Sequence, residues 1–322
     1  MIKIRELNSA KKEIALRSLD EWTVGKTLSW VNCINPTQRE LKEISLKTGI
    51  ALEDLEDSVH PNKRPHVIPY RNYSLIIFKT PYREGGAIKT ASLGIFLFKK
   101  DVITICSRPI PALQHFDELP ESQQILIFKN GAPYFVYRLL DHSLGDFFEM
   151  MDMVSDEIDL IEWQVLHHVQ KVIPKEIFAQ KRVLIYLHKA LIANRDVISA
   201  LEKHYLVEFT EDSFGVLRNL YNDTAQLIDL VTTYRDTLSN VLDMYLSSIN
   251  NNLNNIMKTL TIISAFVLVP MFIASIYGMN FGGESAWNMP ELYWKYGYEF
   301  ALGLMALSVV VIYGFFKRKK WI

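Results

Sequence analysis

The sequence has 322 residues with 35 basic and 36 acidic side chains, so its formal net charge at pH 7 is −1. A chain of this balance lacks the basic footprint of a nucleic-acid-binding protein, and we expect no nucleic-acid partner. Cys33 and Cys106 stand far apart in apolar surroundings, which excludes a disulfide framework and a cysteine zinc site and favours a reducing compartment. The length allows about two domains. The mean hydropathy is only slightly positive, because a large water-soluble part dilutes two short apolar segments.

Residues 1–130 are predicted to form one cytoplasmic α/β domain. The segment 37–49 is typical of a capped amphipathic helix, because Thr37 and Glu40 have the spacing of a capping box, and a second short helix is expected at 51–58. The first residues contain no apolar stretch, so we expect no cleaved signal peptide. Apolar alternation predicts strands at 2–7, 13–19, 27–33, 73–79, 92–98 and 102–106.

Long helices are predicted for residues 131–212, after a loop and short helix marked by Pro109, Pro111 and Pro120. One helix is expected at 134–172 and a second at 175–205, because Pro174 interrupts the pattern. A third helix begins at 213 and meets no proline until Pro270. Its first part, 213–258, is assigned to a stalk. The whole helix to residue 277 would be about 100 Å long.

Two apolar segments near the end of the chain are predicted to cross a membrane. Residues 259–283 contain no ionisable charge, and this charge-free segment is longer than the ~20 residues that a spanning helix needs. We assign 259–280 to the first span, 281–297 to an outer loop, 298–316 to the second span and 317–322 to a basic tail. Lys258 flanks the first span and Lys317, Arg318, Lys319 and Lys320 follow the second, so the positive-inside rule predicts cytoplasmic termini. We therefore expect a multi-pass protein of the inner (plasma) membrane, in contact with lipid.

At the end of the first span, the order of residues resembles the CorA-type magnesium channels. Tyr277, Gly278, Met279 and Asn280 close the span, and Met289, Pro290, Glu291 and Leu292 follow in the loop. The close resemblance covers residues 219–322, and before them only the layout matches. It implies a homopentameric funnel whose first span lines the pore, with Gly278, Met279 and Asn280 as selectivity filter. It also places ion-contacting or gating positions at Asp243, Asn254, Met257 and Leu260.

A polar face along the third helix could line such a pore. Starting at Asp243, steps of four and three residues with a mean of about 3.5 keep one face towards an axis in a left-handed bundle. The positions reached are Ser247, Asn250, Asn254, Met257, Thr261, Ser264, Leu268, Met271, Ser275 and Gly278. The alternative is that small residues merely allow close helix packing in the membrane. Because one such helix cannot enclose a pore, the chain is predicted to oligomerise.

The chemistry expected along this face suits a hydrated cation. Neutral asparagine carbonyls bind Mg²⁺ weakly enough to let it pass, and Met257 with Leu260 would form an apolar constriction. Asp243 would add a ring of carboxylates, or else is a solvated helix residue. Glu284 and Glu291 would attract cations to the outer mouth, or else belong to a solvated loop. No cofactor is expected beyond transported Mg²⁺ and Mg²⁺ in a regulatory role.

Several positions depart from what the resemblance implies. Met271 stands where many relatives have threonine, and residues 282–286 lengthen the outer loop. Asn219 occupies the place of a regulatory stalk carboxylate, for which Asp223, one turn later, could substitute as a metal ligand. An acidic face would either attract exiting Mg²⁺ or simply be solvated; its residues are Asp146, Glu149, Asp152, Asp156, Asp159 and Glu162.

The chain contains no dinucleotide fingerprint, P-loop, nucleophile elbow or zincin histidine pair, so no enzyme is expected and all eight histidines are assigned structural roles. Three functions remain as hypotheses. The first is a passive, potential-driven Mg²⁺ channel gated by intracellular divalent cations. The second is a Zn²⁺, Co²⁺ or Ni²⁺ transporter of the same superfamily, with proton coupling as an option, suggested by Met271 and the longer loop. The third is a cytoplasmic assembly protein that the spans only tether.

Overall fold

The computed structural model describes residues 2–8, 13–60, 63–167, 174–203, 206, 209, 214–279 and 289–322. The chain divides into two compact units, Met1–Leu242 and Asp243–Ile322. Helix α7 (Phe214–Tyr277) contributes to both of them. It continues without a break past residue 258, so the predicted boundary between stalk and span is not marked by a helix end.

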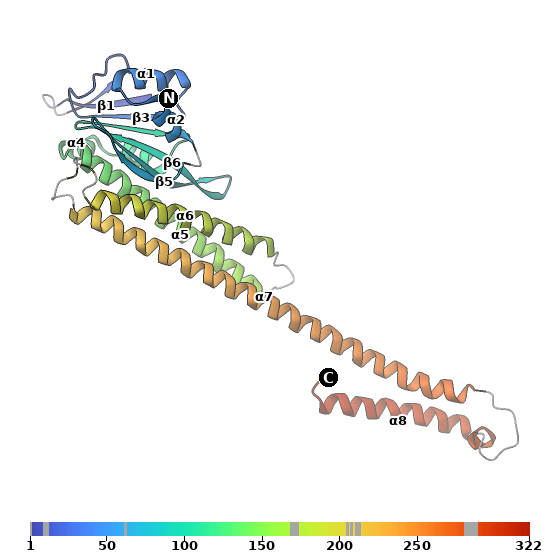
Figure 1. Ribbon diagram of the computed structural model, residues 1–322. Coiled ribbons are helices and arrows are strands. Elements are labelled where there is room, and N and C mark those ends of the chain that lie inside the picture. Colours follow the sequence, from blue (N-terminus) through green and yellow to red (C-terminus); the bar gives the residue numbers. More distant parts are fainter. Residues whose placement is uncertain are drawn as a thin grey trace. The chain divides into compact units, whose positions relative to one another are not determined.

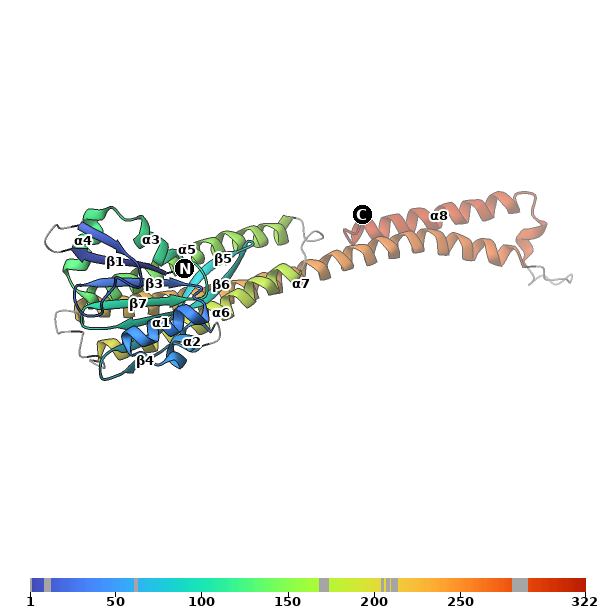
Figure 2. The same cartoon turned by 90° about the horizontal axis from the view of Figure 1, so that it is seen from above.

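The first unit is built on a seven-stranded sheet in the order β2-β1-β3-β7-β6-β5-β4. Neighbouring strands pair antiparallel, apart from the parallel pair β3 and β7 (Figure 2). The predicted α/β domain and its six strands are confirmed. The strands are β1 (Ile2–Asn8), β2 (Glu13–Arg17), β3 (Ser29–Ile34), β4 (His66–Pro69), β5 (Ser74–Glu84), β6 (Ala87–Leu97) and β7 (Asp101–Cys106).

The prediction missed β4 and the outer half of the β5–β6 hairpin. Strand β4 is a short edge strand, and an edge tolerates Pro69 at its last position because proline has no N–H to donate. The hairpin turns at Gly85 and Gly86, whose φ values of 58° and 83° are the left-handed values that a two-residue turn requires.

Helices α1 (Gln38–Thr48) and α2 (Leu52–Val59) form where the sequence predicted two helices, and they cover one face of the sheet (Figure 1). The Thr37 hydroxyl accepts from the Glu40 N–H, and the Glu40 side chain accepts from the Thr37 N–H, which confirms the capping box. Helix α2 lies very close to β6, since a Cβ added at Gly94 would meet the Ser58 Cβ at 2.5 Å. This close packing explains a glycine inside a buried strand.

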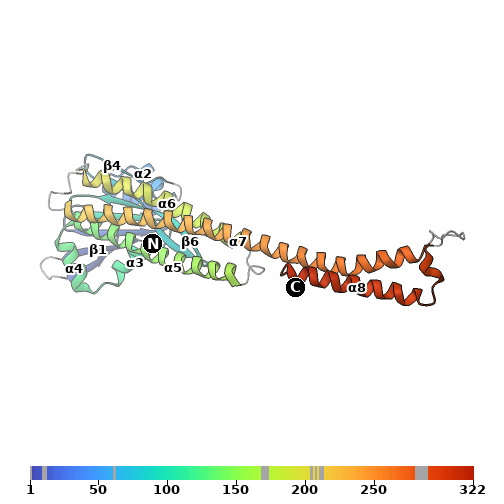
Figure 3. The ribbon, with the colours of Figure 1, turned by 90° about the horizontal axis from the view of Figure 1, so that it is seen from below.

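The other face of the sheet is covered by helices. The prolines begin two short helices rather than the one expected, because Pro111 opens α3 (Pro111–Glu118) and Pro120 precedes α4 (Glu121–Lys129). Helix α5 (Ala132–His167) follows, and the expected helical residues 168–172 lie outside the described part. Helix α6 (Pro174–Glu202) completes this layer, and the first part of α7 lies on the side of α5 and α6 that faces away from the sheet (Figures 1 and 3).

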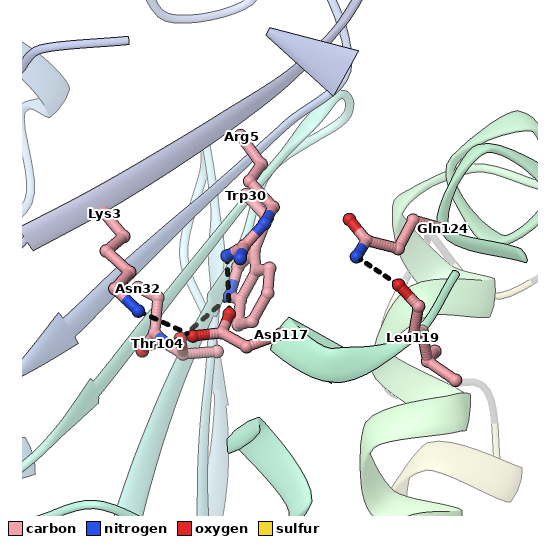
Figure 4. A network of polar contacts seen from close by, with 8 residues as sticks. All are labelled: Lys3, Arg5, Trp30, Asn32, Thr104, Asp117, Leu119 and Gln124. Carbon is pink, nitrogen blue, oxygen red and sulfur yellow. Dashed lines mark hydrogen bonds and ion pairs between the residues drawn. The ribbon is translucent and has the colours of Figure 1, made fainter. Parts of the chain in front are cut away.

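A polar network fixes α3 to the sheet (Figure 4). Asp117 accepts from Lys3 Nζ at 3.0 Å and from Arg5 at 2.5 Å, so two residues of β1 hold one carboxylate of α3. The Arg5 guanidinium also lies 5.3 Å from the centroid of the Trp30 ring. Trp30 Nε1 donates to Thr104 at 2.9 Å, and Thr104 donates to the Asn32 side chain at 3.2 Å. These polar groups join β1, β3, β7 and α3, and those of Trp30, Asn32 and Thr104 are buried.

In the second unit, α8 (Gly297–Arg318) runs antiparallel beside the last part of α7 (Figure 3). The rings of Phe266 and Phe316 meet between the two helices, with centroids 6.3 Å apart. A short 3₁₀ helix, η3 (Pro290–Tyr293), precedes α8. Both helices are long and apolar enough to cross a membrane, and their most apolar windows are 0% and 11% buried. A core helix of a soluble protein would be mostly buried instead.

Candidate functional site: the exposed stripe of helix α7

The positions predicted to line a pore share one face of α7, called the α7 stripe here. Almost all of its residues are exposed, and Ser264 is half-buried. Four of them are large and apolar, with exposed fractions of 60% for Met257, 57% for Leu260, 61% for Leu268 and 64% for Met271. The stripe residues are Asp243, Ser247, Asn250, Asn254, Met257, Leu260, Thr261, Ser264, Leu268, Met271, Ser275 and Gly278.

A different face of α7 carries the contact with α8. Ile262, Phe266 and Ile273 are half-buried, and Phe266 lies against Phe316 of α8. Apolar side chains of this kind suit contact with lipid or with a second span. Because α8 lies on this side, the described part of the second unit leaves the stripe largely uncovered, with Ser264 half-buried.

The polar groups of the stripe present oxygen atoms. The Thr261 hydroxyl donates to the Met257 carbonyl at 2.8 Å, so its proton is used within the helix while its oxygen can still accept. Asn250 and Asn254 are exposed, as are Asn251 and Asn255 next to them. Asn252 is half-buried. Oxygen ligands of this neutral kind suit hard cations and their hydration water.

The outer end of α7 is described as far as Met279. Gly278 N–H donates to the Ala274 carbonyl at 2.9 Å and Met279 N–H to the Ile276 carbonyl at 3.1 Å, so both residues continue the last helical turn. A Cβ at Gly278 would meet the Ala274 carbonyl oxygen at 3.3 Å and the Ser275 carbonyl oxygen at 3.5 Å. Asn280 and Glu284 lie outside the described residues. Glu291 is half-buried in η3, and its carbonyl accepts from the Trp294 N–H at 3.1 Å.

The structure brings Asp223 of α7 towards Asp141 of α5, a residue that the sequence prediction missed. Burial raises the pKa of Asp223. Burial also raises the pKa of Asp141, opposed by the charge of Arg138 and reinforced by that of Asp223. Arg138 donates to Asp141 at 3.1 Å. Asn219 is exposed. No group of three His, Cys, Asp or Glu side chains arranged to hold a metal occurs in the described ranges.

The acidic face of α5 is mostly solvated, with one exception. Glu149, Asp152, Asp156 and Asp159 are exposed and Glu162 is half-buried. Asp146 differs, because burial raises its pKa to about 7 although the Ala112 N–H at the start of α3 donates to it. Its Oδ2 atom is buried and has no hydrogen-bond partner among the described residues.

The fold and sequence were compared with those of known proteins. Residues 25–318 match the family model described as CorA-like Mg2+ transporter protein. A cobalt/magnesium transport protein CorA from Methanocaldococcus jannaschii is 33% identical over 296 residues, which are 92% of this chain and 92% of that protein. The protein of the same name from Thermotoga maritima is 32% identical over 299 residues, covering 92% of this chain and 84% of that one.

A solved structure gives the same result. The complete structure of the CorA magnesium transporter from Methanocaldococcus jannaschii superimposes with a TM-score of 0.88 and 30% identity, covering 100% of this chain and 99% of that chain. The match extends over the sheet, the long helices and the two apolar helices. The chain therefore belongs to the family of CorA-like Mg2+ transporter proteins, which are transporters rather than enzymes.

Proposed function

We propose that this chain is one subunit of a homopentameric channel that imports hydrated Mg²⁺ across the inner membrane, with both termini in the cytoplasm. The observation that carries the proposal is the exposed α7 stripe, where neutral oxygen ligands alternate with apolar positions on a face of α7 that α8 leaves uncovered. The relatives from Methanocaldococcus and Thermotoga, named as cobalt/magnesium transport proteins, support the choice of cargo. Five copies of the stripe would surround one axis.

Ion recognition in this channel rests on weak and repeated contacts. Mg²⁺ is small and gives up its water reluctantly, so carbonyl oxygens that bind the hydrated ion select it without trapping it. Asn280 and the Gly278 carbonyl contact the ion at the outer mouth, where Glu284 and Glu291 raise the local cation concentration. Rings of Asn250 and Asn254 and a ring of Asp243 receive the ion further along the helix.

The gate is an apolar constriction formed by Met257 and Leu260, which blocks conduction by excluding water. Transport needs no chemical energy, since a divalent ion gains about 4.6 kcal/mol per 100 mV of membrane potential. Intracellular Mg²⁺ closes the channel by binding on the stalk. Asp223 is a regulatory ligand and Asp141 its neighbour, and both carboxyl groups have a raised pKa that a bound cation would lower.

The direct test is flux into liposomes loaded with a Mg²⁺-sensitive dye under an inside-negative potential. Wild type should admit Mg²⁺, and Asn280→Ala should reduce the influx by about tenfold or more, the loss expected for about 1.4 kcal/mol of ion recognition. Asn255→Ala, an exposed asparagine outside the stripe, is the matched control and should conduct normally. Equal influx through Asn280→Ala would refute the role of Asn280, and no influx of any divalent ion would refute the channel.

A second candidate is the transport of Zn²⁺, Co²⁺ or Ni²⁺, with or without coupled protons. The observation in its favour is Met271, a residue that is 64% exposed on the stripe and whose thioether is a softer ligand than a threonine hydroxyl. Competition between Mg²⁺ and Zn²⁺ in the same liposomes, with and without a pH gradient, separates the candidates. Zn²⁺ flux that exceeds Mg²⁺ flux and follows the proton gradient would favour the second.

A further inference from the structure

Four consecutive cations end the second apolar helix. Lys317, Arg318, Lys319 and Lys320 are all exposed. Lys258 of α7 lies towards the same end, because α8 runs antiparallel to α7 and Phe316 meets Phe266. Among the described residues after Asp243, the acidic ones are Glu291 and Glu299, which lie before α8 or in its first turn, at the opposite end. The acidic side chains described in the second unit therefore lie away from these cations.

The cations are held in a defined turn. Lys320 has a φ of 55°, and its N–H donates to the Lys317 carbonyl at 3.1 Å. The Trp321 N–H donates to the Phe316 carbonyl at 3.0 Å. This pair of bonds around a left-handed residue is the Schellman motif that ends many helices. Glycine is the usual residue at the left-handed position, so lysine adopts it at a conformational cost and places a charge there.

An aromatic contact closes the turn. The Trp321 ring stacks on Phe316, with centroids 5.6 Å apart and planes at 18°. Phe316 is 5% exposed, whereas Trp321 remains 40% exposed. Phe316 in turn contacts Phe266 of α7. The tail therefore folds back onto the helix pair, and its last tryptophan lies beside the cations instead of extending away from them.

The surroundings of the turn match the boundary of a membrane. Tyr313 and Phe315 on the last turns of α8 are 46% and 58% exposed, and Lys317 Nζ lies 5.8 Å from the Tyr313 ring centroid. Exposed aromatic rings next to lysines are typical of the level of lipid headgroups, where the rings meet glycerol and acyl chains and the ammonium groups meet phosphate. A free anion would use the cations alone and would leave these rings unexplained.

We propose that this C-terminal turn binds the headgroup phosphates of anionic phospholipids in the leaflet next to it. Lys319 and Lys320 on the turn, together with Lys317, contact the phosphates, and Trp321 inserts its exposed edge at the glycerol level. The chain of rings from Trp321 through Phe316 to Phe266 joins the bound lipid to the helix that carries the stripe. If the proposed function holds, occupancy stabilises the packing of α8 on α7 and thereby changes Mg²⁺ flux.

The binding test uses tryptophan quenching by brominated lipids in vesicles of phosphatidylcholine alone or mixed with phosphatidylglycerol. The chain has six tryptophans, so the contribution of Trp321 is the difference between wild type and Trp321→Phe, which keeps a ring on Phe316. Brominated phosphatidylglycerol should quench this contribution more than brominated phosphatidylcholine does. Neutralising one cation should weaken the preference for phosphatidylglycerol by about fivefold. The double variant Lys319→Gln/Lys320→Gln should weaken it by about twenty-five-fold, because the two effects multiply.

Two single variants control for folding of the turn. Lys320→Gly removes a charge but suits the left-handed conformation, so it should preserve quenching in phosphatidylcholine and still lose preference for the anionic lipid. Lys295→Gln removes a cation at the other end of α8 and should change nothing. Equal quenching of Trp321 by both brominated lipids overturns the proposal. So does loss of the difference when soluble glycerol phosphate is added, because that would indicate a site for free anions.

Flux measurements then address regulation separately. Mg²⁺ influx into mixed vesicles should differ from influx into phosphatidylcholine vesicles, and the difference should shrink in Lys319→Gln with Lys320→Gln. Equal influx in both lipids would overturn the regulatory part. Absence of influx in every lipid would instead refute the channel, while the quenching result would still decide the lipid site.

Discussion

The side-chain amide of Asn194 pairs with the backbone of Lys79. Asn194 Nδ2 donates to the Lys79 carbonyl at 2.8 Å, and Lys79 N–H donates to Asn194 Oδ1 at 2.9 Å. Strand β4 pairs with β5 only as far as Ile77. Lys79 lies beyond the last residue of β5 that pairs with β4. Asn194, fully buried on α6, therefore takes the place of a neighbouring strand at Lys79.

Replacing Asn194 by leucine should destabilise the first unit. Both backbone groups of Lys79 would lose these partners in a buried place, which costs about 2–4 kcal/mol. Asn222→Leu, at an exposed position of α7, is the control and should change stability by less than about 0.5 kcal/mol. Thermal unfolding of the detergent-solubilised protein measures both. A melting temperature for Asn194→Leu equal to wild type would contradict the pairing.

Two adjacent residues of α7 should respond differently to a large side chain. Ser275 lies on the α7 stripe, whereas Ile276 is exposed on the neighbouring apolar face. Ser275→Trp would fill the axis of the proposed pore and should reduce Mg²⁺ flux by about tenfold or more, and Ile276→Trp should leave it within about twofold. Liposome flux with equal protein incorporation compares them. Wild-type flux through both variants would contradict the placement of Ser275 in the pore, whereas absence of flux in wild type and both variants would favour a mere membrane tether.

A side chain at Gly94 should separate α2 from the sheet. Gly94→Ala would place a Cβ at 2.5 Å from the Ser58 Cβ, and backbone of α2 would have to move. Overpacking of this kind costs about 1–3 kcal/mol. Gly145→Ala is the control, because nothing lies within 4 Å of its added Cβ and alanine favours the helix. If both alanine variants unfold at the wild-type temperature, α2 packs less tightly than described.

Asp146 should make stability depend on pH. Burial raises its folded pKa to about 7, well above the ordinary value of an aspartate, so the folded state keeps a proton between about pH 4 and pH 7 that the unfolded state has lost. Stability from this group is therefore present at the low end of that window and is lost as pH rises through it. Asp146→Asn should gain about 1–2 kcal/mol over wild type at pH 8 and little at pH 4.

His142, one turn earlier on α5, makes stability depend on pH in the opposite direction to Asp146. Burial and the charges of His115 and Arg138 lower its pKa to about 4, so its contribution to stability falls as pH drops from about 6.5 towards 4. Because His142 is present in both proteins, the difference between wild type and Asp146→Asn isolates Asp146. A difference that does not change between pH 4 and pH 8 would contradict the raised pKa.

Local signals in the sequence were sufficient for most elements of the fold. The capping box at Thr37, the break at Pro174 and the charge-free spans each depend on neighbouring residues, and the structure has an element boundary or helix at each of them. Strand β4 was missed because four residues ending in proline give little periodicity. The stripe could be predicted as a face of a helix, whereas the roles of its residues in conduction remain predictions.

Relationships between distant residues could not be predicted. Nothing local indicates that Asp141 approaches Asp223 or that Asn194 pairs with Lys79, because the first depends on how α7 packs beside α5 and the second on how α6 packs on the sheet. The turn at Lys320 could not be predicted either, because the sequence there shows only a run of cations and no glycine that would indicate a left-handed residue. A left-handed lysine becomes plausible only once Trp321 is seen stacked on Phe316.

The parallel seam between β3 and β7 has a consequence for synthesis of the protein. Strands β2, β1 and β3 can associate as soon as they leave the ribosome, but the other edge of β3 waits for β7, which begins at Asp101. Because translation adds about 5–20 residues per second, this edge of β3, a strand that is buried in the folded protein, stays without its β7 partner for several seconds. Nascent chains of this protein thus expose the unpaired edge of β3 early in synthesis. We expect chaperones to bind most strongly at this stage, before the first unit is complete.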